Sequence, residues 1–592
     1  MYNYGVIGNC SLVALIDNHG GIDWLCLPSP DSPPLFGQLL DPEGGRFSIS
    51  APERAITRQR YLEHTNILTT DVETAAGVFR ITDFCPRYEE RGRTFRPREI
   101  CRKVEPLSGA PYITVACRAI AGWERTGLKP YVGSHAIHYE FGGTEATLST
   151  TIAPGDIVAE RIRPLTEPVY FVLGHGSEPI GDLRSYVEDG LKETEQHWRT
   201  WVGHLALPAR YQPEVVRSAL TLKLNCLEES GAILAAPTTS LPEEFGGERN
   251  WDYRFCWLRD SAFVLDAFRK LGRYEEMAEF LSFLLEVAGS AAELHPVYRA
   301  NRTLPLPEEI HLGWRGFRDS RPVRSNNQAA EHRQYDVYGE MLHAVSPLFL
   351  DERMADLRSA EHTDLFRFLA EKAAATIGER DAGPWEFRSH EQVHAFSALA
   401  SWVGLRDVAA AQAHGHLKDI PLDIPYEMTR AAKVIEAAVV DGAVRNGPAD
   451  PSFDAALLLM PIFGYPDRGL NERTVSAIHR ALAARPEELR SPHLYRYRRA
   501  DDFGTPRGSF VICSYWLTEA LARLGHLDEA RRMMEELARC TNHLGLLSEH
   551  IDPVTYEQSG NFPQAYSHVG LINAAFAISG AAAPTGERRT TG

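Results

Sequence analysis

The chain has 592 residues, so it is too long for one ordinary domain, and about two to four domains are expected. Hydrophobic residues make up 44% and charged residues 24%, the composition of a globular protein with a core of normal size. The net charge of −17 disfavours a nucleic-acid or anionic-membrane partner and leaves a neutral or weakly polar substrate.

Cysteine usage and the N-terminus bear on the compartment. The nine scattered cysteines contain no CxxC pair, so neither a zinc site nor a disulfide framework is indicated. The first twenty residues lack the positive region and apolar run of a signal peptide, and no apolar stretch approaches the length of a membrane span. We therefore expect a cytoplasmic protein with reduced thiols and no membrane partner; both a monomer and an oligomer fit the sequence.

Residues 1–182 alternate short runs rich in Val, Ile, Thr, Phe and Tyr with Gly, Pro and Asp. Examples are the runs at 66–74, 78–84, 112–120, 146–152 and 169–173. Short strands at regular spacing, separated by turn signals, are typical of an antiparallel β-sandwich. The first third of the chain is therefore predicted to be a β domain.

The rest of the chain has helical periodicity. Residues 183–205 have helical spacing, so 183–210 is predicted to be a helical linker. In residues 211–580 about a dozen helical segments follow, and their number suggests a closed ring of helix pairs. They begin near Pro213, Trp257, Tyr274, Gln328, Asp364, Glu391, Ile424, Ser452, Glu472, Ser509, Leu527 and Gln564. The tail, 581–592, is expected to be disordered.

The segment 249–260 has the highest density of aromatic and charged residues. It holds two Trp, one Tyr, three Arg and two Asp directly before an apolar helical run. A helix start would explain Asp260, which lies near the positive N-terminal end of a helix, but not the aromatic residues. A sugar needs flat aromatic faces and fixed Arg and Asp side chains. We therefore favour a sugar site for this segment, in which Trp251, Tyr253 and Trp257 are grouped with Arg254 and Arg259.

The loop 312–324 has a similar composition, with one Trp and four Arg. A basic surface loop would explain it as well, and Arg clusters also bind phosphate. We predict that Trp314 and Arg315 contribute to the substrate site.

Two carboxylates stand beside residues that a sugar-cleaving site needs. Glu386 follows Trp385, whose ring would desolvate the carboxyl and keep it protonated, as a general acid requires. Glu549 lies between an apolar pair and a Pro-terminated turn, where a capping role is equally compatible with its position. Glu391 lies further into a helix, where a solvated face is expected. Two facing carboxyl groups are the minimum for hydrolysing a glycosidic bond.

These segments resemble glycoside hydrolase family 15, and in particular its bacterial glucoamylase/trehalase-like branch. Seven ordered matches across the chain carry the resemblance. They are 7–10 with 21–28, 250–260, 322–324, 336–340, 385–388 with Ser397 and Trp402, 545–553, and 560–568.

The resemblance implies an N-terminal super-β-sandwich, a helical linker and a C-terminal (α/α)6 barrel with the site at one end. It implies an inverting mechanism without a metal or an organic cofactor. By position, Glu386 resembles the general acid and Glu549 the general base. The residues that resemble the grip on the terminal sugar and the lining of its subsite are Arg259, Asp260, Tyr253 and Trp257.

Three positions depart from the pattern of the branch. Ser389 replaces a usual Gly, Phe317 lies in a loop that usually reads differently, and His550 stands where a second acid is common. The leading hypothesis is an exo-acting, inverting hydrolase that releases β-glucose from the non-reducing end of α-glucosides. Alternatives are an α,α-trehalase and a hydrolase of a small natural-product glycoside. A glycoside phosphorylase and a non-catalytic sugar-binding protein are weaker alternatives.

Overall fold

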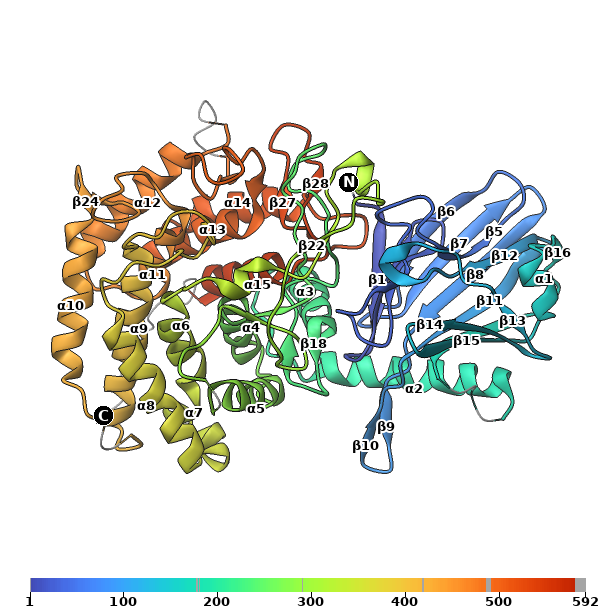
Figure 1. Cartoon of the computed structure of the whole chain (residues 1–592), viewed down its shortest axis with the longest axis horizontal. Coiled ribbons are helices and arrows are strands. Elements are labelled where there is room, and N and C mark those ends of the chain that lie inside the picture. Colours follow the sequence, from blue (N-terminus) through green and yellow to red (C-terminus); the bar gives the residue numbers. More distant parts are fainter. Residues whose placement is uncertain are drawn as a thin grey trace, which may run out of the picture.

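The computed structural model describes residues 2–176, 179, 181–289, 291–417, 420–485 and 491–580. The expected disordered tail at 581–592 lies outside these residues. A β-rich part and a helical part lie side by side, the first blue and the second green to red in Figure 1. In the described part of the chain, no helix has both the length and the apolarity needed to span a membrane. All nine cysteines, each within that part, are free thiols.

The β-rich part contains two large antiparallel sheets. The first has the order β1-β2-β3-β5-β12-β16, with β4 paired to β3. Its strands are β1 (Tyr4–Gly8), β2 (Val13–Asp17), β3 (Ile22–Cys26), β4 (Pro34–Phe36), β5 (Arg46–Ser50), β12 (Tyr112–Arg118) and β16 (Arg163–Pro164). The second sheet has the order β13-β14-β15-β17-β11-β8-β7-β6. Its strands are β6 (Ile56–Tyr61), β7 (Leu68–Thr74), β8 (Gly77–Phe84), β11 (Glu99–Gly109), β13 (Tyr131–Val132), β14 (Ala136–Phe141), β15 (Thr144–Thr150) and β17 (Val169–His175).

The two sheets pack face to face. Phe47 on β5 and Phe171 on β17 meet edge to face, with ring centroids 5.9 Å apart. Arg102 on β11 is completely buried and pairs with the buried Asp83 on β8 at 2.6 Å. It also donates to the carbonyl oxygen of Phe47 at 3.1 Å, so it ties one sheet to the other. The five sequence runs named above overlap β7, β8, β12, β15 and β17, so the predicted β domain is confirmed.

A long helix, α2 (Leu183–Gly203), connects the two parts and runs beneath the sheets in Figure 1. The side chain of Asp182 caps its first turn by accepting from the backbone N–H of Ser185 at 2.9 Å. Near its other end, Trp201 donates to Glu276 of the helical part at 3.3 Å. Two short elements also adjoin the β part: the helix α1 (Pro154–Val158) and the hairpin β9 (Tyr88–Glu90) with β10 (Arg93–Phe95).

Among the described residues, the helical part consists of six successive helix pairs. The first members are α3 (Gln212–Asn225), α5 (Glu275–Gly289), α8 (Ala360–Ala375), α10 (Ile424–Ala437), α12 (Arg468–Leu482) and α14 (Leu527–Ala538). The second members are α4 (Leu258–Lys270), α6 (Asp336–Val345), α9 (Ala395–Ala413), η5 (Ala455–Leu458) continuing into α11 (Leu459–Ile462), α13 (Val511–Leu524) and α15 (Ala565–Gly580). A short α7 (Pro347–Leu350) follows α6.

The second members of the pairs form a cycle of contacts. Each one contacts the next along the chain, and α15 contacts both α13 and α4. Helices α9, α13 and α15 are buried on nearly every side, as expected for helices enclosed by others. In contrast, α14 buries one face. The described helices therefore form an inner ring with an outer layer.

The long connections of the helical part lie before the inner helices. The segments 226–257, 376–394, 483–510 and 539–564 each precede an inner helix, whereas 271–274, 463–467 and 525–526 each follow one and are short. A backbone hydrogen bond joins two of the long segments, from Gly560 N–H to Pro242 O at 2.6 Å. Long loops gathered at one end of a rigid scaffold are where binding residues are expected.

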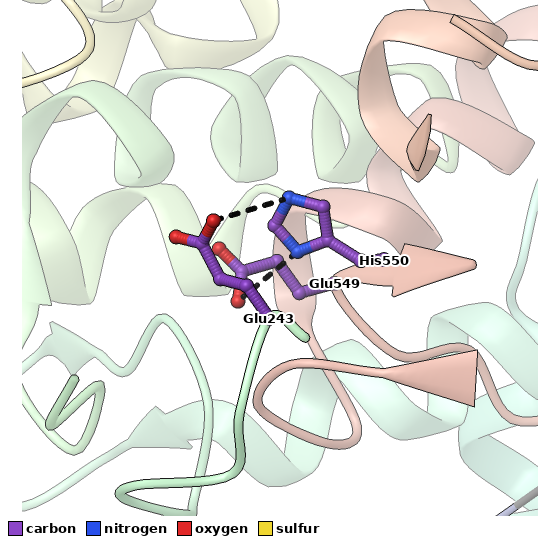
Figure 2. Close-up of side chains that lie close together, drawn as sticks. All are labelled: Glu243, Glu549 and His550. Atoms are coloured by element: carbon purple, nitrogen blue, oxygen red, sulfur yellow. Dashed lines mark ion pairs between the residues drawn. The ribbon is translucent and has the colours of Figure 1, made fainter. Parts of the chain in front are cut away.

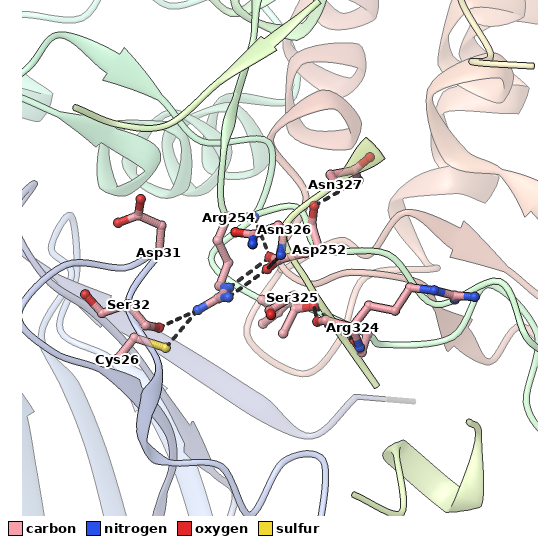
Figure 3. Close-up of polar contacts among 12 residues, drawn as sticks. Cys26, Asp31, Ser32, Asp252, Arg254, Arg324, Ser325, Asn326 and Asn327 are labelled. Atoms are coloured by element: carbon pink, nitrogen blue, oxygen red, sulfur yellow. Dashed lines mark hydrogen bonds and ion pairs between the residues drawn. The ribbon is translucent and has the colours of Figure 1, made fainter. Parts of the chain in front are cut away.

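The first of these long loops is anchored on the β part. Figure 3 shows Arg254 reaching from the loop toward Ser32 and Cys26. Its guanidinium donates to the carbonyl of Ser32 at 2.6 Å and to both carboxylate oxygens of Asp252 at 2.8 and 2.7 Å. From the β part, Trp24 donates to the carbonyl of Pro237 at 2.8 Å. These buried contacts fix the loop that leads into α4.

Candidate active site

The long loops enclose a pocket that brings together residues far apart in sequence. Its walls contain aromatic rings, guanidinium groups and carboxylates, the combination expected of a sugar site. The lining residues are Glu243, Arg249, Trp251, Tyr253, Asn327, Ala329, His332, Trp385, Glu386, Phe387, Arg388, Arg496, Tyr497, Asp501, Asp502 and Phe503.

Glu386 faces this pocket from the loop before α9. Its backbone has φ of +65°, the left-handed region that costs energy for a residue with a Cβ and is found preferentially at functional sites. The indole N–H of Trp257 donates to Glu386 Oε1 at 2.7 Å, and a guanidinium nitrogen of Arg259 lies 3.4 Å from the same oxygen. The other oxygen, Oε2, makes no hydrogen bond to any residue in the described part of the chain. The Glu386 side chain is 23% exposed, so it remains open to the pocket.

Glu549 lies on the loop before α15 and is 1% exposed. The hydroxyl of Tyr253 donates to its Oε1 at 2.6 Å, and the backbone N–H of Asn561 lies 3.4 Å from Oε2. Burial first, and then the charge of Glu549, raise the pKa of Tyr253 well above its ordinary value, so this hydroxyl keeps its proton and remains a donor. Glu549 is therefore held as a hydrogen-bond acceptor.

Tyr253 and Trp257 connect the two carboxylates. Their ring centroids are 5.5 Å apart, and each directs its polar hydrogen to a different carboxylate. One short segment thereby positions both acids. The sequence prediction that Tyr253, Trp257, Glu386 and Glu549 lie together matches this arrangement.

Arg259 and Asp260 begin α4 next to Glu386. Arg259 donates to the carbonyl of Pro384 at 2.5 Å and lies 3.3 Å from the Asp260 carboxylate. Asp260 is buried, and burial raises the pKa of this carboxyl to about 6, although the Arg259 charge opposes the rise. Neither residue is among those that line the pocket, but Arg259 contacts Glu386, which lines it.

Trp385, whose ring was expected to desolvate Glu386, lines the pocket and directs its indole N–H to Asp454. Its indole N–H is shared by the two oxygens of Asp454 at 2.8 and 3.0 Å, and its ring packs near Phe510 and Trp516. The Trp that contacts Glu386 is Trp257, from another loop. Trp385 and Glu386 are adjacent in sequence but have different partners, and the backbone at Glu386 has a left-handed conformation.

The structure does not bring Trp314 and Arg315 into the pocket. Trp314 is 1% exposed, packs against Trp123 of the β part at a centroid distance of 5.5 Å and donates to its carbonyl at 2.8 Å. The backbone N–H of Arg315 donates to Asp41 at 2.9 Å, and its half-exposed side chain pairs with Asp319. These two predicted positions therefore need correction: they hold the loop 312–324 against the β part. Composition could not distinguish these roles, because a loop rich in aromatic and basic residues can either line a sugar pocket or pack against another domain.

Several pocket residues were not predicted, although Trp251 belongs to the segment that was assigned to a sugar site. Trp251, within the dense segment 249–260, is flanked by the guanidinium groups of Arg324 and Arg388, 4.5 and 4.6 Å from its ring. Phe503 meets the same ring edge to face at 4.8 Å. Ser389, one of the departures, hydrogen bonds to Asp502. The aromatic and charged run at 495–503 was the signal that could have found this wall.

Among the described residues, one group has donor atoms close enough to hold a metal ion: Glu243, Glu549 and His550, with atoms within 4.8 Å of one another (Figure 2). Protein cations already occupy Glu243, because Arg496 lies 3.2 Å and Arg249 3.9 Å from its carboxylate. Tyr253 and the Asn561 N–H likewise take up the oxygens of Glu549. We therefore do not identify the group as metal ligands.

Comparison with known proteins gives a consistent result over the whole chain. The sequence profile of "Glycosyl hydrolases family 15" matches residues 209–576, and that of "Trehalase-like, N-terminal" matches 3–120. The chain is 32% identical to the trehalase of Mycolicibacterium smegmatis over 97% of this chain and 90% of that protein. It is 31% identical to the trehalase of Thermoplasma volcanium over 97% of this chain and 92% of that protein.

Among solved structures, a bacterial glucoamylase complexed with acarbose has a similar fold. The TM-score is 0.68 at 13% sequence identity, and the similarity covers 98% of this chain and 94% of the other. At this identity, the likeness concerns the arrangement of a β part and a helical part.

Proposed function

Since the chain belongs to glycosyl hydrolases family 15 and is a glycoside hydrolase, we propose that it hydrolyses α,α-trehalose with inversion of configuration. The similarity to trehalases extends over nearly the full length of both chains, which supports trehalose as the first substrate to test. The leading sequence hypothesis, a glucoamylase-like exo-hydrolase, has support from the glucoamylase fold and is the second candidate.

The observation that carries the proposal is the pair of carboxylates in unequal surroundings. Glu549 is buried and accepts hydrogen bonds at both oxygens, which suits an ionised base. Glu386 is open to the pocket, and its Oε2 has no hydrogen-bond partner among the described residues, which suits an acid that must reach the substrate. We assign Glu386 as the general acid and Glu549 as the general base.

The reaction follows from these roles. Glu386 gives its proton to the glycosidic oxygen, and the bond from this oxygen to the anomeric carbon breaks. Glu549 takes a proton from a water that attacks the opposite face of the sugar. Inversion requires the carboxyl groups to be roughly 6.5–9.5 Å apart so that the water fits between them.

The remaining predicted residues support the sugar. Arg259 and Asp260 grip the hydroxyls of the terminal glucose, because they lie beside Glu386 and form an adjacent donor and acceptor pair. The rings of Tyr253, Trp257 and Trp385 face the same sugar. Pocket residues such as Trp251 and Arg388 form the wall around the departing sugar.

The finer fold is also part of this proposal. The cycle of inner helices and its outer layer support an (α/α)6 barrel over 211–580. The packing of β5 against β17 supports a super-β-sandwich over 1–182, and α2 supports a linker over 183–210.

A substrate panel tests the proposed specificity. We expect kcat/KM for trehalose to exceed that for maltose and isomaltose by at least about tenfold, which corresponds to a transition-state difference of about 1.4 kcal/mol. Turnover should be the same with and without added phosphate, because water is the nucleophile. A preference for maltose would favour the glucoamylase-like alternative. A strict need for phosphate as co-substrate, with glucose phosphate as product, would replace hydrolysis by phosphorolysis.

A further inference from the structure

We propose that His550 is a positioning residue for the general base, and that Glu243 anchors His550 for this task. The proposal rests on the proposed role of Glu549 as the base. It gives a function to a position where this chain departs from the pattern of its branch.

His550 lies between two carboxylates (Figure 2). Its Nε2 is 3.9 Å from Glu243 Oε2, and its Nδ1 is 3.6 Å from Glu549 Oε2. The three residues are 1%, 4% and 1% exposed, in the order His550, Glu243, Glu549. Nδ1 is buried and makes no hydrogen bond to any residue in the described part of the chain. The ring therefore presents this nitrogen to the oxygen of Glu549 that Tyr253 does not contact.

The backbone holds the imidazole in this place. His550 begins β27 (His550–Ile551), which pairs with β26 (Ser509–Phe510) on one side and β28 (Gln558–Ser559) on the other. The imidazole stacks on Phe510 with a centroid distance of 4.6 Å and an interplanar angle of 13°. Gly560, with φ of +77°, allows the close approach, because a Cβ there would lie 2.6 Å from Glu549 Oε2 and 3.1 Å from His550 Nδ1.

Glu243 is itself fixed and ionised. Its carbonyl accepts from the hydroxyl of Ser559 on β28 at 2.9 Å, so its backbone is tied to the same small sheet. Trp251 donates to its carboxylate at 3.3 Å. Burial alone would raise the pKa of this carboxyl, but the charges of Arg496, His550 and Arg249 lower it below the ordinary value. A carboxylate that stays ionised orients the imidazole through its Nε2.

This arrangement gives the base two supports. Tyr253 donates to Oε1 of Glu549, and Nδ1 of His550 faces Oε2 at 3.6 Å. Each imidazole nitrogen faces a carboxylate: Nε2 faces Glu243 and Nδ1 faces Glu549. A proton on either nitrogen would therefore point to an acceptor. The further charged groups around the ring are Arg496 and Arg249, which face Glu243, and Asp501, which pairs with Arg249. Removal of His550 should therefore leave Oε2 of Glu549 without the imidazole that faces it.

The test uses α-glucosyl fluoride, whose fluoride leaves without a general acid, so that its inverting hydrolysis depends on the base alone. For His550→Leu we expect kcat to fall by about tenfold or more, because the loss is that of a contact to a charged group. The acidic limb of the kcat–pH profile should move to higher pH, because the buried carboxylate of Glu549 loses the imidazole that faces it. KM should change by less than about twofold.

Two further variants separate positioning from packing. His550→Asn places an amide N–H₂ near the place of Nδ1 and should recover most of kcat and the wild-type acidic limb. Glu243→Gln should shift the limb in the same direction as His550→Leu, and the double variant should be no worse than His550→Leu alone, because both act through one contact. His493→Leu is the matched control, since His493 is also buried and also meets an aromatic ring, that of Tyr556 at 5.4 Å.

The outcomes are distinguishable. Wild-type kcat and an unmoved limb in His550→Leu would overturn this inference. So would a His550→Asn variant as slow as His550→Leu, which would show that the ring matters for packing. Full activity of Glu549→Gln on the fluoride would instead remove the base assignment of the proposed function, and this inference with it.

Discussion

Tyr253 and Trp257 are four positions apart in sequence, and they hold two carboxylates that are 163 positions apart. Composition alone could predict that the segment 249–260 contributes to a sugar site, because aromatic rings and Arg/Asp pairs are concentrated there. It could not predict which ring holds which acid. Trp385 adjoins Glu386 in sequence, yet its indole N–H goes to Asp454, because partners at this site are set by the meeting of distant loops.

Tyr253→Phe tests the support of the base at the residue scale. We expect kcat to fall by about 10- to 100-fold with little change in KM, because a hydrogen bond to a charged group contributes about 1.5–3 kcal/mol. Steady-state kinetics with the natural substrate measures this loss. Tyr139→Phe is the matched control, since it removes a buried hydroxyl that donates to the carbonyl of Cys117 at 2.8 Å in the β part. If Tyr253→Phe is as fast as the control, the Tyr253 hydroxyl does not support Glu549 as the base.

Glu386→Gln tests the proposed acid. Its kcat on trehalose should fall by about 10²- to 10⁴-fold, the usual contribution of a general acid. Its kcat on α-glucosyl fluoride should remain within about tenfold of wild type, because the fluoride needs no proton to leave. Equal losses on both substrates would mean that Glu386 binds the sugar without protonating the leaving group.

At the scale of elements, helix positions were largely predictable from periodicity. Ten of the twelve predicted helix starts lie within four residues of the start of an observed α-helix. The starts predicted near Gln328 and Ser452 meet 3-10 helices instead. These are η3 (Gln328–Glu331), which precedes α6, and η5, which continues into α11. The position of the loop 312–324 was harder to predict. Trp314 is buried against Trp123 of the β part, and the sequence of the loop alone does not reveal this contact.

Arg254→Met tests how the loop before α4 is anchored. It leaves the buried Asp252 without its main cation, so we expect a loss of stability of about 3–5 kcal/mol. Scanning calorimetry should show a lower Tm, with unfolding of the β part and the helical part less tightly coupled. Arg199→Met provides the control, because Arg199 pairs with Glu195 on the exposed face of α2 and such pairs contribute about 0–1 kcal/mol. Equal Tm values for the two variants would refute the anchoring role.

At the scale of the whole molecule, the helical part contains buried carboxyl groups, Asp336 at the start of α6 and Asp381 in the loop before α9. Burial raises the pKa of Asp336 to about 7 and that of Asp381 to about 6. Neither oxygen of Asp336 makes a hydrogen bond to a residue of the described chain. The prediction of a cytoplasmic protein without metal remains a prediction from the sequence.

The raised pKa of Asp336 predicts that the folded protein becomes less stable as pH rises. The folded chain holds a proton on Asp336 between about pH 4, where the unfolded side chain releases it, and about pH 7. Stability from this group is therefore present at low pH and is lost as pH rises through this window. Asp336→Asn should raise Tm relative to wild type by a few degrees at pH 8 and by less at pH 4.5. Asp364→Asn, at an exposed position of α8, should show no such difference; a pH-independent change in Asp336→Asn would contradict the prediction.

The measurement that tests the central claim most directly is ¹H NMR of the first products of trehalose hydrolysis, before mutarotation. Inversion at one anomeric carbon releases β-glucose, and the departing sugar keeps its α configuration, so the account predicts equal initial amounts of α- and β-glucose. In H₂¹⁸O the label should enter the β-anomer. Initial release of α-glucose alone would contradict the inverting assignment of Glu386 and Glu549.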